Sequence, residues 1–504
     1  MNGKVYLVGA GPGDYKLITL KALECIKIAD VIVYDRLINQ NYLKEVKENC
    51  ELINVGKSSN NHLLRQEEIN KLLVHKALEG KIVTRLKGGD PYVFGRGGEE
   101  GEFLSNNNIE FEVVPGVTSA IGGLCYAGIP ITHRDYTSSF YVITGHHRDD
   151  GKSIEGINWN LLAKTKGTIV ILMGVNNIKD ISENLIKEGK DRNTPLAFIS
   201  SATKYNQKVI TTTLENVYEV YKKENIQSPT LIVIGEVVNL RNKLNFFEEK
   251  LLFGKNIIVT RSRAQSSNLV EMILDNGGNP IEIPTIKIKP IENNTDLENE
   301  IKKIKEYTYI IFSSKNAAEI FFNKIDEIGY DSRILYNIKI CAVGEETAKY
   351  IKSRGIISDI VPQKYIAEEL YNLLKDKLNN KDKILIPRSK NARDFLVKKL
   401  SEKCIVKEID TYETIIDNSR KKDILEIIED NEICYITFTS SSTVKNFIEI
   451  VGKENINKLN NTKIISIGDI TSKTIEENGL KVYKQSREST ISSMMETIIN
   501  DNNI

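Results

Sequence analysis

The sequence predicts an α/β protein with more than one domain. Short runs rich in β-branched residues alternate with longer amphipathic stretches along almost its whole length, as in folds where helices cover mostly parallel sheets. Hydrophobic residues make up 40% and charged residues 27%, which is typical of globular proteins, and 504 residues correspond to about three domains of about 150 residues each. In the first half the predicted strands are residues 5–8, 31–34, 82–86, 141–144, 169–173 and 231–234.

The charge balance and the cysteines exclude several classes of protein. Lys plus Arg number 69 and Asp plus Glu 68, so the net charge of +1 produces no basic field that would favour nucleic acid. The six cysteines show no CxxC spacing, which indicates reduced thiols rather than disulfides or a zinc site. The amino end passes from a short strand into a glycine turn, and no apolar run approaches the ~20 residues of a membrane span. We therefore expect a cytoplasmic protein that binds neither nucleic acid nor membrane.

A break in the pattern divides the chain near residues 245–254. Residues 240–254 show no strand pattern, and a new strand at 257–260 restarts the alternation. All five histidines precede this break, so chemistry in the second half must proceed without imidazole. His146 and His147 are adjacent, and no carboxylate follows them at a helical ligand spacing, so we predict no metal site.

The first glycine loop, residues 9–14, directly follows the first predicted strand. Its sequence GAGPGD is close to the dinucleotide fingerprint GxGxxG, but Asp14 stands where that motif requires glycine and Pro12 removes a backbone donor. NAD binding is therefore disfavoured. The glycines indicate a tight turn that lets a ligand approach the carboxyl end of a strand, with a plain left-handed turn as the alternative.

Three further loops of the first half have a more specialised composition than loops that only connect secondary-structure elements. Residues 86–99 combine five glycines, a proline, two aromatic residues and charges of both signs. Residues 113–120 pass from a strand through Pro and Gly to Thr and Ser, which predicts a helix with a capped amino terminus. Residues 128–134, GIPITHR, supply another polar turn.

Taken in order, these segments resemble the uroporphyrinogen-III C-methyltransferase family. The resemblance covers residues 1 to about 243 and rests on GAGPGD (9–14), YDRL (34–37), KGGDPYVFGRGGE (87–99), PGVTSA (115–120), AGIPITHR (127–134), TGH (144–146) and MGV (173–175). It implies the tetrapyrrole-methylase fold of two α/β subdomains, about 1–114 and 115–243, with S-adenosylmethionine in the cleft between them and a homodimer formed through this half. The implied cofactor contacts are Pro12, Gly88, Gly89, Asp90, Val93, Thr118, Ser119, Met173, Ala202 and Thr230.

Methyl transfer to a tetrapyrrole needs alignment of the donor and a base for the acceptor. A sulfonium donor requires little proton chemistry, so the protein must chiefly align it and exclude water, and Asp90 can meet its ribose hydroxyls or amino group. A methylated pyrrole carbon must lose a proton, so one base is expected nearby. By the same resemblance, Asp35 is the proton acceptor and Lys57 the proton donor. The alternatives are that Asp35 caps a helix and that Lys57 is a solvated charge or a contact to a substrate carboxylate.

In the second half, each of six predicted strands runs into a polar cluster. The strands are residues 257–260, 309–312, 338–343, 384–387, 435–438 and 464–467, and the clusters are residues 261–267, 313–316, 344–347, 388–391, 439–443 and 468–472. Each cluster is expected to open a helix whose free N–H groups attract anions, and together they would ring a cleft for a polycarboxylate. For any one cluster the alternative is an ordinary helix cap.

The amino-acid sequence of this half is similar to that of the uroporphyrinogen-III synthase family. The similar segments are TRSRAQSS (260–267), FSSKNA (312–317), AVGEETA (342–348), DTYET (410–414), TFTSSSTVKNF (437–447) and SIGDITS (466–472). The family implies two α/β lobes, one of about 252–286 plus 415–504 and the other of about 288–413, and no cofactor. It also implies that Tyr412 assists the departure of a hydroxyl from the substrate; the alternative is an aromatic ring packed at a strand end beside the hinge.

Together the two resemblances predict a bifunctional enzyme. Residues 1–243 would be the methyltransferase, 244–254 a linker and 252–504 the synthase. The synthase half would close hydroxymethylbilane to uroporphyrinogen III with inversion of the last pyrrole, and the other half would methylate two ring carbons to give precorrin-2 for sirohaem or cobalamin. In the alternative, the second half is a non-catalytic regulatory module that binds tetrapyrroles.

Overall fold

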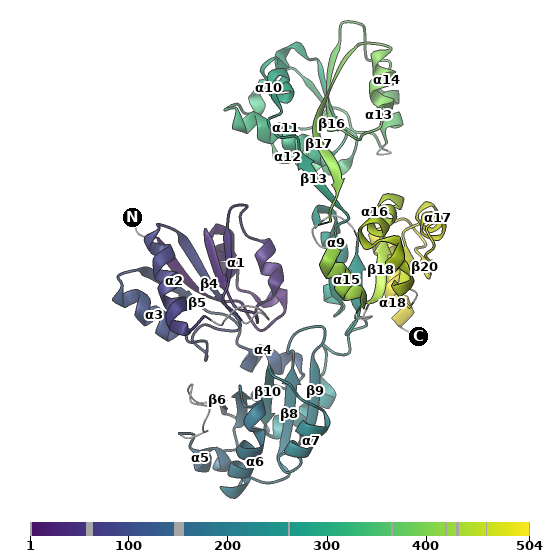
Figure 1. Ribbon diagram of the computed structural model, residues 1–504. Coiled ribbons are helices and arrows are strands. Elements are labelled where there is room, and N and C mark those ends of the chain that lie inside the picture. Colours follow the sequence, from purple (N-terminus) through teal and green to yellow (C-terminus); the bar gives the residue numbers. More distant parts are fainter. Residues whose placement is uncertain are drawn as a thin grey trace. The chain divides into compact units, whose positions relative to one another are not determined.

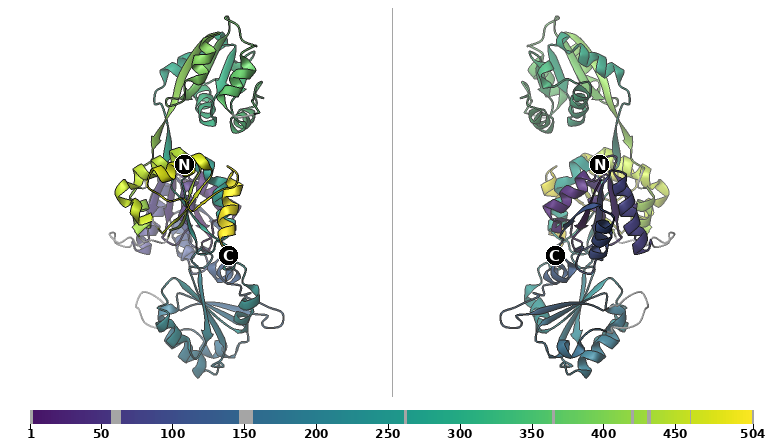
Figure 2. Two further views of the ribbon diagram at one scale, coloured as in Figure 1. Left: turned by 90° about the vertical axis from the view of Figure 1, so that its right-hand side faces the viewer. Right: turned by 90° about the vertical axis from the view of Figure 1, so that its left-hand side faces the viewer.

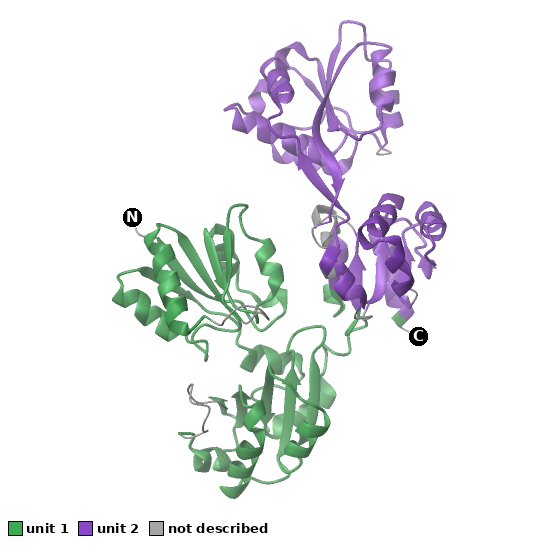
Figure 3. Cartoon of the chain, in the orientation of Figure 1, with its two compact units in different colours: residues 1–255, 273–279, 502–504 green, residues 256–272, 280–501 purple. Residues whose placement is uncertain are grey.

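The computed structural model describes residues 3–56, 64–145, 156–260, 263–363, 366–418, 421–429, 433–459 and 461–502. The chain forms two compact units (Figure 3). The first unit comprises residues 1–255, 273–279 and 502–504, and the second comprises residues 256–272 and 280–501. Each unit contains two five-stranded sheets in the described part of the chain (Figure 1).

The first sheet is wholly parallel, with the strand order β3-β2-β4-β1-β5. Its inner strands are continuous apolar runs because helices cover both faces. One face packs against α2 and α3, and the other packs against α1. The elements are β1 (Lys4–Gly9), α1 (Leu20–Ile28), β2 (Val31–Tyr34), β3 (Glu51–Asn54), α2 (Gln66–Leu78), β4 (Ile82–Lys87), α3 (Gly97–Asn106) and β5 (Glu110–Val114).

The second sheet is mixed, with the order β6-β7-β10-β8-β9. Strands β6 and β7 are parallel, and the other neighbours are antiparallel. Helix α4 packs on one face, while α5, α6 and α7 pack on the other. The elements are α4 (Ser119–Tyr126), β6 (Phe140–Thr144), α5 (Trp159–Lys164), β7 (Thr168–Leu172), α6 (Ile178–Lys187), β8 (Pro195–Ser200), β9 (Lys208–Thr213), α7 (Val217–Lys223) and β10 (Thr230–Ile234).

Residues 241–255, which include the predicted linker, contain no strand and pack onto the first unit. They begin with the short helix α8 (Arg241–Leu244). The Phe247 ring lies 4.7 Å from that of Tyr126 and 5.4 Å from that of Phe253. Leu252 is fully buried, and its N–H donates to the Asn276 carbonyl at 3.0 Å. Aromatic packing and backbone hydrogen bonds therefore anchor this segment.

In the second unit, one sheet has the order β12-β11-β18-β19-β20 and the other β13-β17-β16-β14-β15. Two extended segments, residues 283–286 and 416–418, connect them (Figures 1 and 2). The first sheet and its helices comprise β11 (Asn256–Val259), α9 (Arg263–Asp275), β12 (Asn279–Glu282), α15 (Lys421–Glu429), β18 (Ile433–Phe438), α16 (Ser441–Val451), β19 (Lys463–Ser466), α17 (Asp469–Glu477), β20 (Lys484–Gln485) and α18 (Ile491–Asn502). The second sheet and its helices comprise β13 (Ile286–Pro290), α10 (Thr295–Lys302), β14 (Tyr309–Phe312), α11 (Lys315–Glu327), β15 (Lys339–Ala342), α12 (Glu345–Ser353), α13 (Ala367–Leu374), β16 (Lys383–Ser389), α14 (Phe395–Ser401) and β17 (Ile405–Ile416).

These elements confirm the predicted α/β class and correct one predicted helix start. Helices begin within the clusters at 313–316, 344–347, 439–443 and 468–472, and Thr118 caps α4 as expected. The cluster at 388–391 opens no helix, because Arg388 and Ser389 end strand β16 and α14 starts only at Phe395. No described helix combines the length and the apolar character needed to cross a lipid bilayer.

Candidate functional site

A cavity of about 690 Å³ lies in the first unit, where loops from its two sheets meet. Its wall comes from the loops that follow β1, β2, β4 and β5, together with segments around the ends of β7 and β8 and the start of β10. Carboxyl ends of parallel strands converge at one edge of a sheet, which explains why four of these loops meet. The wall includes all ten residues predicted to contact a cofactor: Pro12, Gly88, Gly89, Asp90, Val93, Thr118, Ser119, Met173, Ala202 and Thr230.

Glycines allow three of these loops to touch backbone to backbone. Gly89 donates its N–H to the Gly11 carbonyl at 2.7 Å, and Gly11 donates to the Gly89 carbonyl at 3.2 Å. A Cβ on Gly116 would lie 2.3 Å from the Gly89 carbonyl oxygen and 2.8 Å from Gly9 Cα. Because real Cβ atoms do not approach so closely, only glycine fits at position 116 without moving the neighbouring loops.

Three non-glycine residues on the cavity wall have left-handed backbones. The φ angles are 54° at Phe94, 56° at Met173 and 49° at Ser201. This conformation brings Cβ close to the backbone and costs about 1–2 kcal/mol per residue. Such residues gather at functional sites, where the surrounding structure holds them in place.

The Asp90 carboxylate holds the loop in which it lies. Its Oδ1 accepts the N–H of Tyr92 at 2.8 Å, and its Oδ2 accepts the N–H of Gly116 at 3.0 Å. Asp90 thus ties the loop after β4 to the turn that leads into α4. Each carboxylate oxygen has a second lone pair, so this role leaves room for the predicted contact to a ligand.

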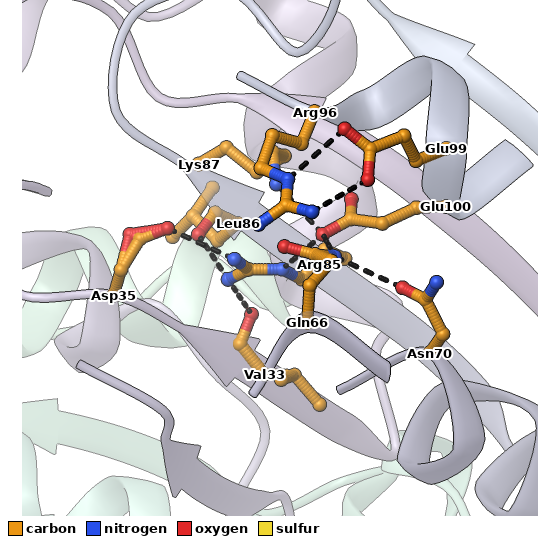
Figure 4. Close-up of polar contacts among 10 residues, drawn as sticks. All are labelled: Val33, Asp35, Gln66, Asn70, Arg85, Leu86, Lys87, Arg96, Glu99 and Glu100. Carbon is orange, nitrogen blue, oxygen red and sulfur yellow. Dashed lines mark hydrogen bonds and ion pairs between the residues drawn. The ribbon is translucent and has the colours of Figure 1, made fainter. Parts of the chain in front are cut away.

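Asp35 lies just after β2 and is held by a buried arginine (Figure 4). Arg85, on β4 and 4% exposed, donates from Nη2 to Asp35 Oδ2 at 3.0 Å. The other oxygen, Oδ1, is buried and has no hydrogen-bond partner in the described part of the chain. None of the described helices has Asp35 as its N-cap residue, so the alternative of a capping aspartate is wrong.

The arginine is itself part of a buried ion network (Figure 4). Glu100 on α3 is fully buried, and its Oε1 accepts from Arg85 Nε at 3.2 Å, from Lys87 Nζ at 2.8 Å and from Gln66 Nε2 at 3.0 Å. Burial, followed by the charge of Arg85, lowers the pKa of Lys87. With Asp35 the network holds two carboxylates and two cations, which compensates its charges within the protein.

One predicted site residue, Lys57, lies outside the described residues. So do His146 and His147, for which no metal site was predicted. Elsewhere, the part of the chain that the structure describes contains no group of three or more His, Cys, Asp and Glu side chains that could hold a metal ion. Arg36 and Lys204 line the cavity of the first unit but were not among the predicted site residues.

A second cavity, of about 680 Å³, lies in the second unit beside β16 and β17. Tyr412 on β17 is 6% exposed and lines this cavity; its hydroxyl lies 3.0 Å from Ser314 Oγ. The pairing of β16 with β17 is irregular between Arg388 and Ser389, and Ser389 pairs with Tyr412. A bulge at such a place re-aims a side chain. Tyr412 lies inside the strand rather than at its end, so the strand-end alternative is wrong in that respect.

The expected ring of polar clusters contributes only in part to this cavity. Ser313, Ser314, Ser389 and Asn391 come from two of the clusters, whereas those at 439–443 and 468–472 supply no lining residue. Arg388 is 4% exposed and is already paired, with Glu408 at 2.6 Å and Asp394 at 2.9 Å. It therefore serves the packing of this lobe rather than as a free anion site.

Comparison with known proteins places both halves in one biosynthetic context. The family of tetrapyrrole (corrin/porphyrin) methylases matches residues 4–218, and that of uroporphyrinogen-III synthase HemD matches residues 267–496. The porphyrin biosynthesis protein HemD of Ruminiclostridium josui is 40% identical over 499 residues, which are 99% of this chain and 98% of that protein. A uroporphyrinogen-III C-methyltransferase of Bacillus subtilis (strain 168) is 51% identical over 249 residues, covering 49% of this chain and 96% of the relative.

The first unit is also similar to a solved structure. The uroporphyrin-III C-methyl transferase from Thermus thermophilus, complexed with S-adenyl homocysteine, is 39% identical, with a TM-score of 0.41, and covers 47% of this chain and 100% of its own.

Proposed function

Because this chain belongs to the family in which a uroporphyrinogen-III C-methyltransferase is fused to a uroporphyrinogen-III synthase, we propose that it converts hydroxymethylbilane to precorrin-2. It is an enzyme of tetrapyrrole biosynthesis that carries both a methyltransferase and a synthase. We assign methyl transfer to residues 1–243, in subdomains of about 1–114 and 115–243, and ring closure to residues 252–504, in lobes of about 252–286 plus 415–504 and 288–413. The products would feed sirohaem or cobalamin formation in the cytoplasm.

The observation that carries the methyltransferase assignment is the single cavity that gathers all ten predicted donor contacts. Its volume of about 690 Å³ lies within the range of ligand pockets, and its glycine loops permit close backbone approach. S-adenosylmethionine, when bound, would supply an electrophilic methyl group on sulfur. The loops around Gly89 and Gly116 would hold the donor in one orientation and exclude water from it.

The acceptor side requires a base, and we assign that role to Asp35. Arg85 holds one carboxylate oxygen, while the buried partner oxygen Oδ1 has a lone pair available for a proton. The buried pair fixes the carboxylate in one orientation, because both Arg85 and Glu100 are packed in place. Lys57 is assigned as the proton donor from the family resemblance alone.

In the second unit, we assign assistance of the leaving hydroxyl to Tyr412. Ser314 caps α11, and its Oγ accepts the N–H of Ala317 at 3.2 Å. The Ser314 hydroxyl can donate its own proton to the Tyr412 oxygen, and in that arrangement the Tyr412 proton can point into the cavity. The pyrrole nitrogens of the substrate would push the hydroxyl out, and the protein would mainly fold the linear chain for inversion of the last ring. No cofactor is assigned to this half.

The deciding experiment incubates the full chain with hydroxymethylbilane and S-adenosylmethionine and follows the product by mass. We expect a cyclic tetrapyrrole of the type III series that carries two added methyl groups. Formation of only the type I isomer, the product of spontaneous closure, would refute the synthase assignment and favour a regulatory tetrapyrrole-binding module. A type III ring without added methyl groups would refute the methyltransferase assignment. Sedimentation of the same sample tests the homodimer that we propose for the methyltransferase half.

A further inference from the structure

Two cations on the wall of the first cavity have no carboxylate partner in the described part of the chain. Arg36 follows strand β2, and Lys204 lies in the turn between β8 and β9; both line the cavity. Within the described ranges of the chain, no carboxylate oxygen lies within 4.0 Å of the cationic nitrogens of either residue. Lys204 is partly buried, whereas Arg36 is exposed. A cation that is partly removed from water without a partner is unfavourable, so Lys204 beside Arg36 calls for an explanation.

The turn that carries Lys204 is fixed to the first glycine loop. Thr203 Oγ1 accepts the N–H of Asp14 at 3.0 Å, and the Thr203 N–H donates to Gln207 Oε1 at 2.8 Å. A Cβ on Gly13 would lie 3.0 Å from Lys204 Cγ and 3.1 Å from Lys204 Cε. The methylene chain of Lys204 therefore lies against the Gly13 backbone. A side chain at position 13 would occupy the same space.

The electrostatics agree with a site for an anion. Burial and the nearby charge of Arg36 lower the pKa of Lys204. By contrast Lys190, whose pKa burial also lowers, donates to two backbone carbonyls, at 3.0 Å to Thr165 and 3.4 Å to Leu162, and lines neither cavity described above. The fold therefore supplies hydrogen-bond acceptors for Lys190, whereas Lys204 lines the cavity of the first unit.

We propose that Lys204 and Arg36 form a carboxylate-binding site on the wall of this cavity. The proposal rests on the proposed function, because both candidate carboxylates belong to its substrates: that of the amino-acid part of the methyl donor, and one of those on the tetrapyrrole. Arg36 follows the proposed base Asp35, and Lys204 is two residues from the proposed donor contact Ala202. A carboxylate between them would be held by charge-assisted hydrogen bonds and would separate the two like charges.

The test uses the full chain with Lys204→Gln, which keeps most of the stem against Gly13 but removes the charge. Calorimetry measures the affinity for S-adenosylhomocysteine and for 5′-methylthioadenosine, which lacks the amino-acid carboxylate, and kinetics give the KM for uroporphyrinogen III. Lys204→Arg should restore the parent values. Lys208→Gln is the matched control, because Lys208 lies four residues on in the same hairpin, is exposed and pairs with Glu224 at 3.0 Å.

We expect a loss of about 10- to 100-fold in one affinity only, the value of a hydrogen bond to a charged group. Weaker binding of S-adenosylhomocysteine with unchanged 5′-methylthioadenosine binding assigns the site to the donor carboxylate. A raised KM for uroporphyrinogen III with both nucleoside affinities unchanged assigns it to the tetrapyrrole. Equal loss for both nucleosides, or no change in any value, overturns the site. If the parent chain transfers no methyl group, the proposed function fails first, which separates the two outcomes.

Discussion

The two cavities of this chain are built from different parts of the polypeptide. In the first unit the loops at Gly11, Gly89 and Gly116 touch one another backbone to backbone, and Gly11 and Gly89 line the cavity. In the second unit no glycine lines the cavity in the described part of the chain, and Tyr412 and Ser314 form a hydroxyl pair on its wall. Close backbone contact excludes any residue with a side chain at the point of contact. Contact through side chains does not impose this restriction on the backbone. The first site therefore depends on loop geometry, and the second on a few individual groups.

The largest effect is expected for Asp35→Asn, which tests whether the first site also needs an individual group. Asparagine can keep the bond from Arg85 but cannot accept the substrate proton as a base. Methyl transfer should fall by about 10²- to 10⁴-fold while affinity for S-adenosylhomocysteine holds. Asp30→Asn is the control, because Asp30 precedes the same strand and pairs with Lys47 away from the cavity. Turnover at the parent rate would remove Asp35 from the mechanism.

Tyr412→Phe makes the corresponding test in the second unit. The ring keeps its packing but loses its proton, so ring closure should slow by about 10²- to 10⁴-fold while the product remains the type III isomer. Methylation of added uroporphyrinogen III should not change. Tyr307→Phe, which breaks a bond to Glu300 in the same lobe, serves as the control. If Tyr412→Phe closes the ring normally and Tyr412→Ala does not, the residue acts through packing alone.

Substitutions of glycines next to the two cavities test this comparison. Gly116→Ala forces apart three loops of the first unit, and a displacement near 1 Å typically costs about 10²-fold in rate. Gly344→Ala in the second unit meets nothing within 4 Å, so ring closure should hardly change. Both activities are measured on both variants. Equal tolerance at the two positions would contradict the distinction between a site that depends on close backbone contact and one that does not.

A smaller effect is expected for Asp90→Asn. One of the two backbone N–H groups that Asp90 accepts would face an amide NH₂ instead, so the loop should loosen. Affinity for S-adenosylhomocysteine should fall about 10-fold, with ring closure untouched. Glu99→Gln is the control, because Glu99 lies in the first turn of α3, just after this loop, and pairs with Arg96 at 2.6 Å. Equal loss of both activities would mean that the two halves do not work independently.

Asp501→Asn should leave both activities unchanged and alter stability alone. Asp501 is 4% exposed and accepts from Lys463 at 2.5 Å, Lys484 at 2.6 Å and Tyr435 at 2.8 Å, away from the second cavity. These bonds hold the pKa of Asp501 below its usual 3.8 despite burial, which acts in the opposite direction. Its contribution is therefore present above about pH 4 and lost as the pH falls through the lowered value. Urea unfolding at pH 7 should show a loss of about 1.5–3 kcal/mol, and a smaller difference from the parent in acid.

Most of the fold was predictable, because the inner strands are uninterrupted apolar runs. Strands β2 and β14 occupy the predicted residues. Some strands that escaped prediction are polar or lie at edges, such as β9 with its sequence KVITTT. Strand β8, PLAFIS, was also missed, although it is an inner strand with four buried apolar residues. Strand β13, IKIKP, has a regular alternation that would have revealed it. Strand β17 mixes charged and apolar residues because it extends beyond the core of its lobe toward the connection.

The candidate site was predictable only where it depends on motifs. The glycine loops are visible in the sequence because the backbone contacts exclude other residues. The link from Arg85 to Glu100 was missed, because no local pattern reveals that residues 15 positions apart share a buried ion pair. A signal was present: two charged residues, Arg85 and Lys87, occur in a strand whose residues are almost all buried. Arg36 and Lys204 were missed because their meeting place depends on how the two sheets of the first unit pack.

The left-handed backbone of Met173 lowers the thermal stability of the first unit, whereas the residue contributes to its function. Glycine at this position would relax the strain of about 1–2 kcal/mol and raise the melting temperature by a few degrees. The same change would remove a side chain from the cavity wall and let the segment after β7 sample other conformations. Variants selected for heat tolerance alone would therefore be expected to accept glycine here and to lose methyl transfer. The sequence that folds best at this position is thus a different one from the sequence that works best.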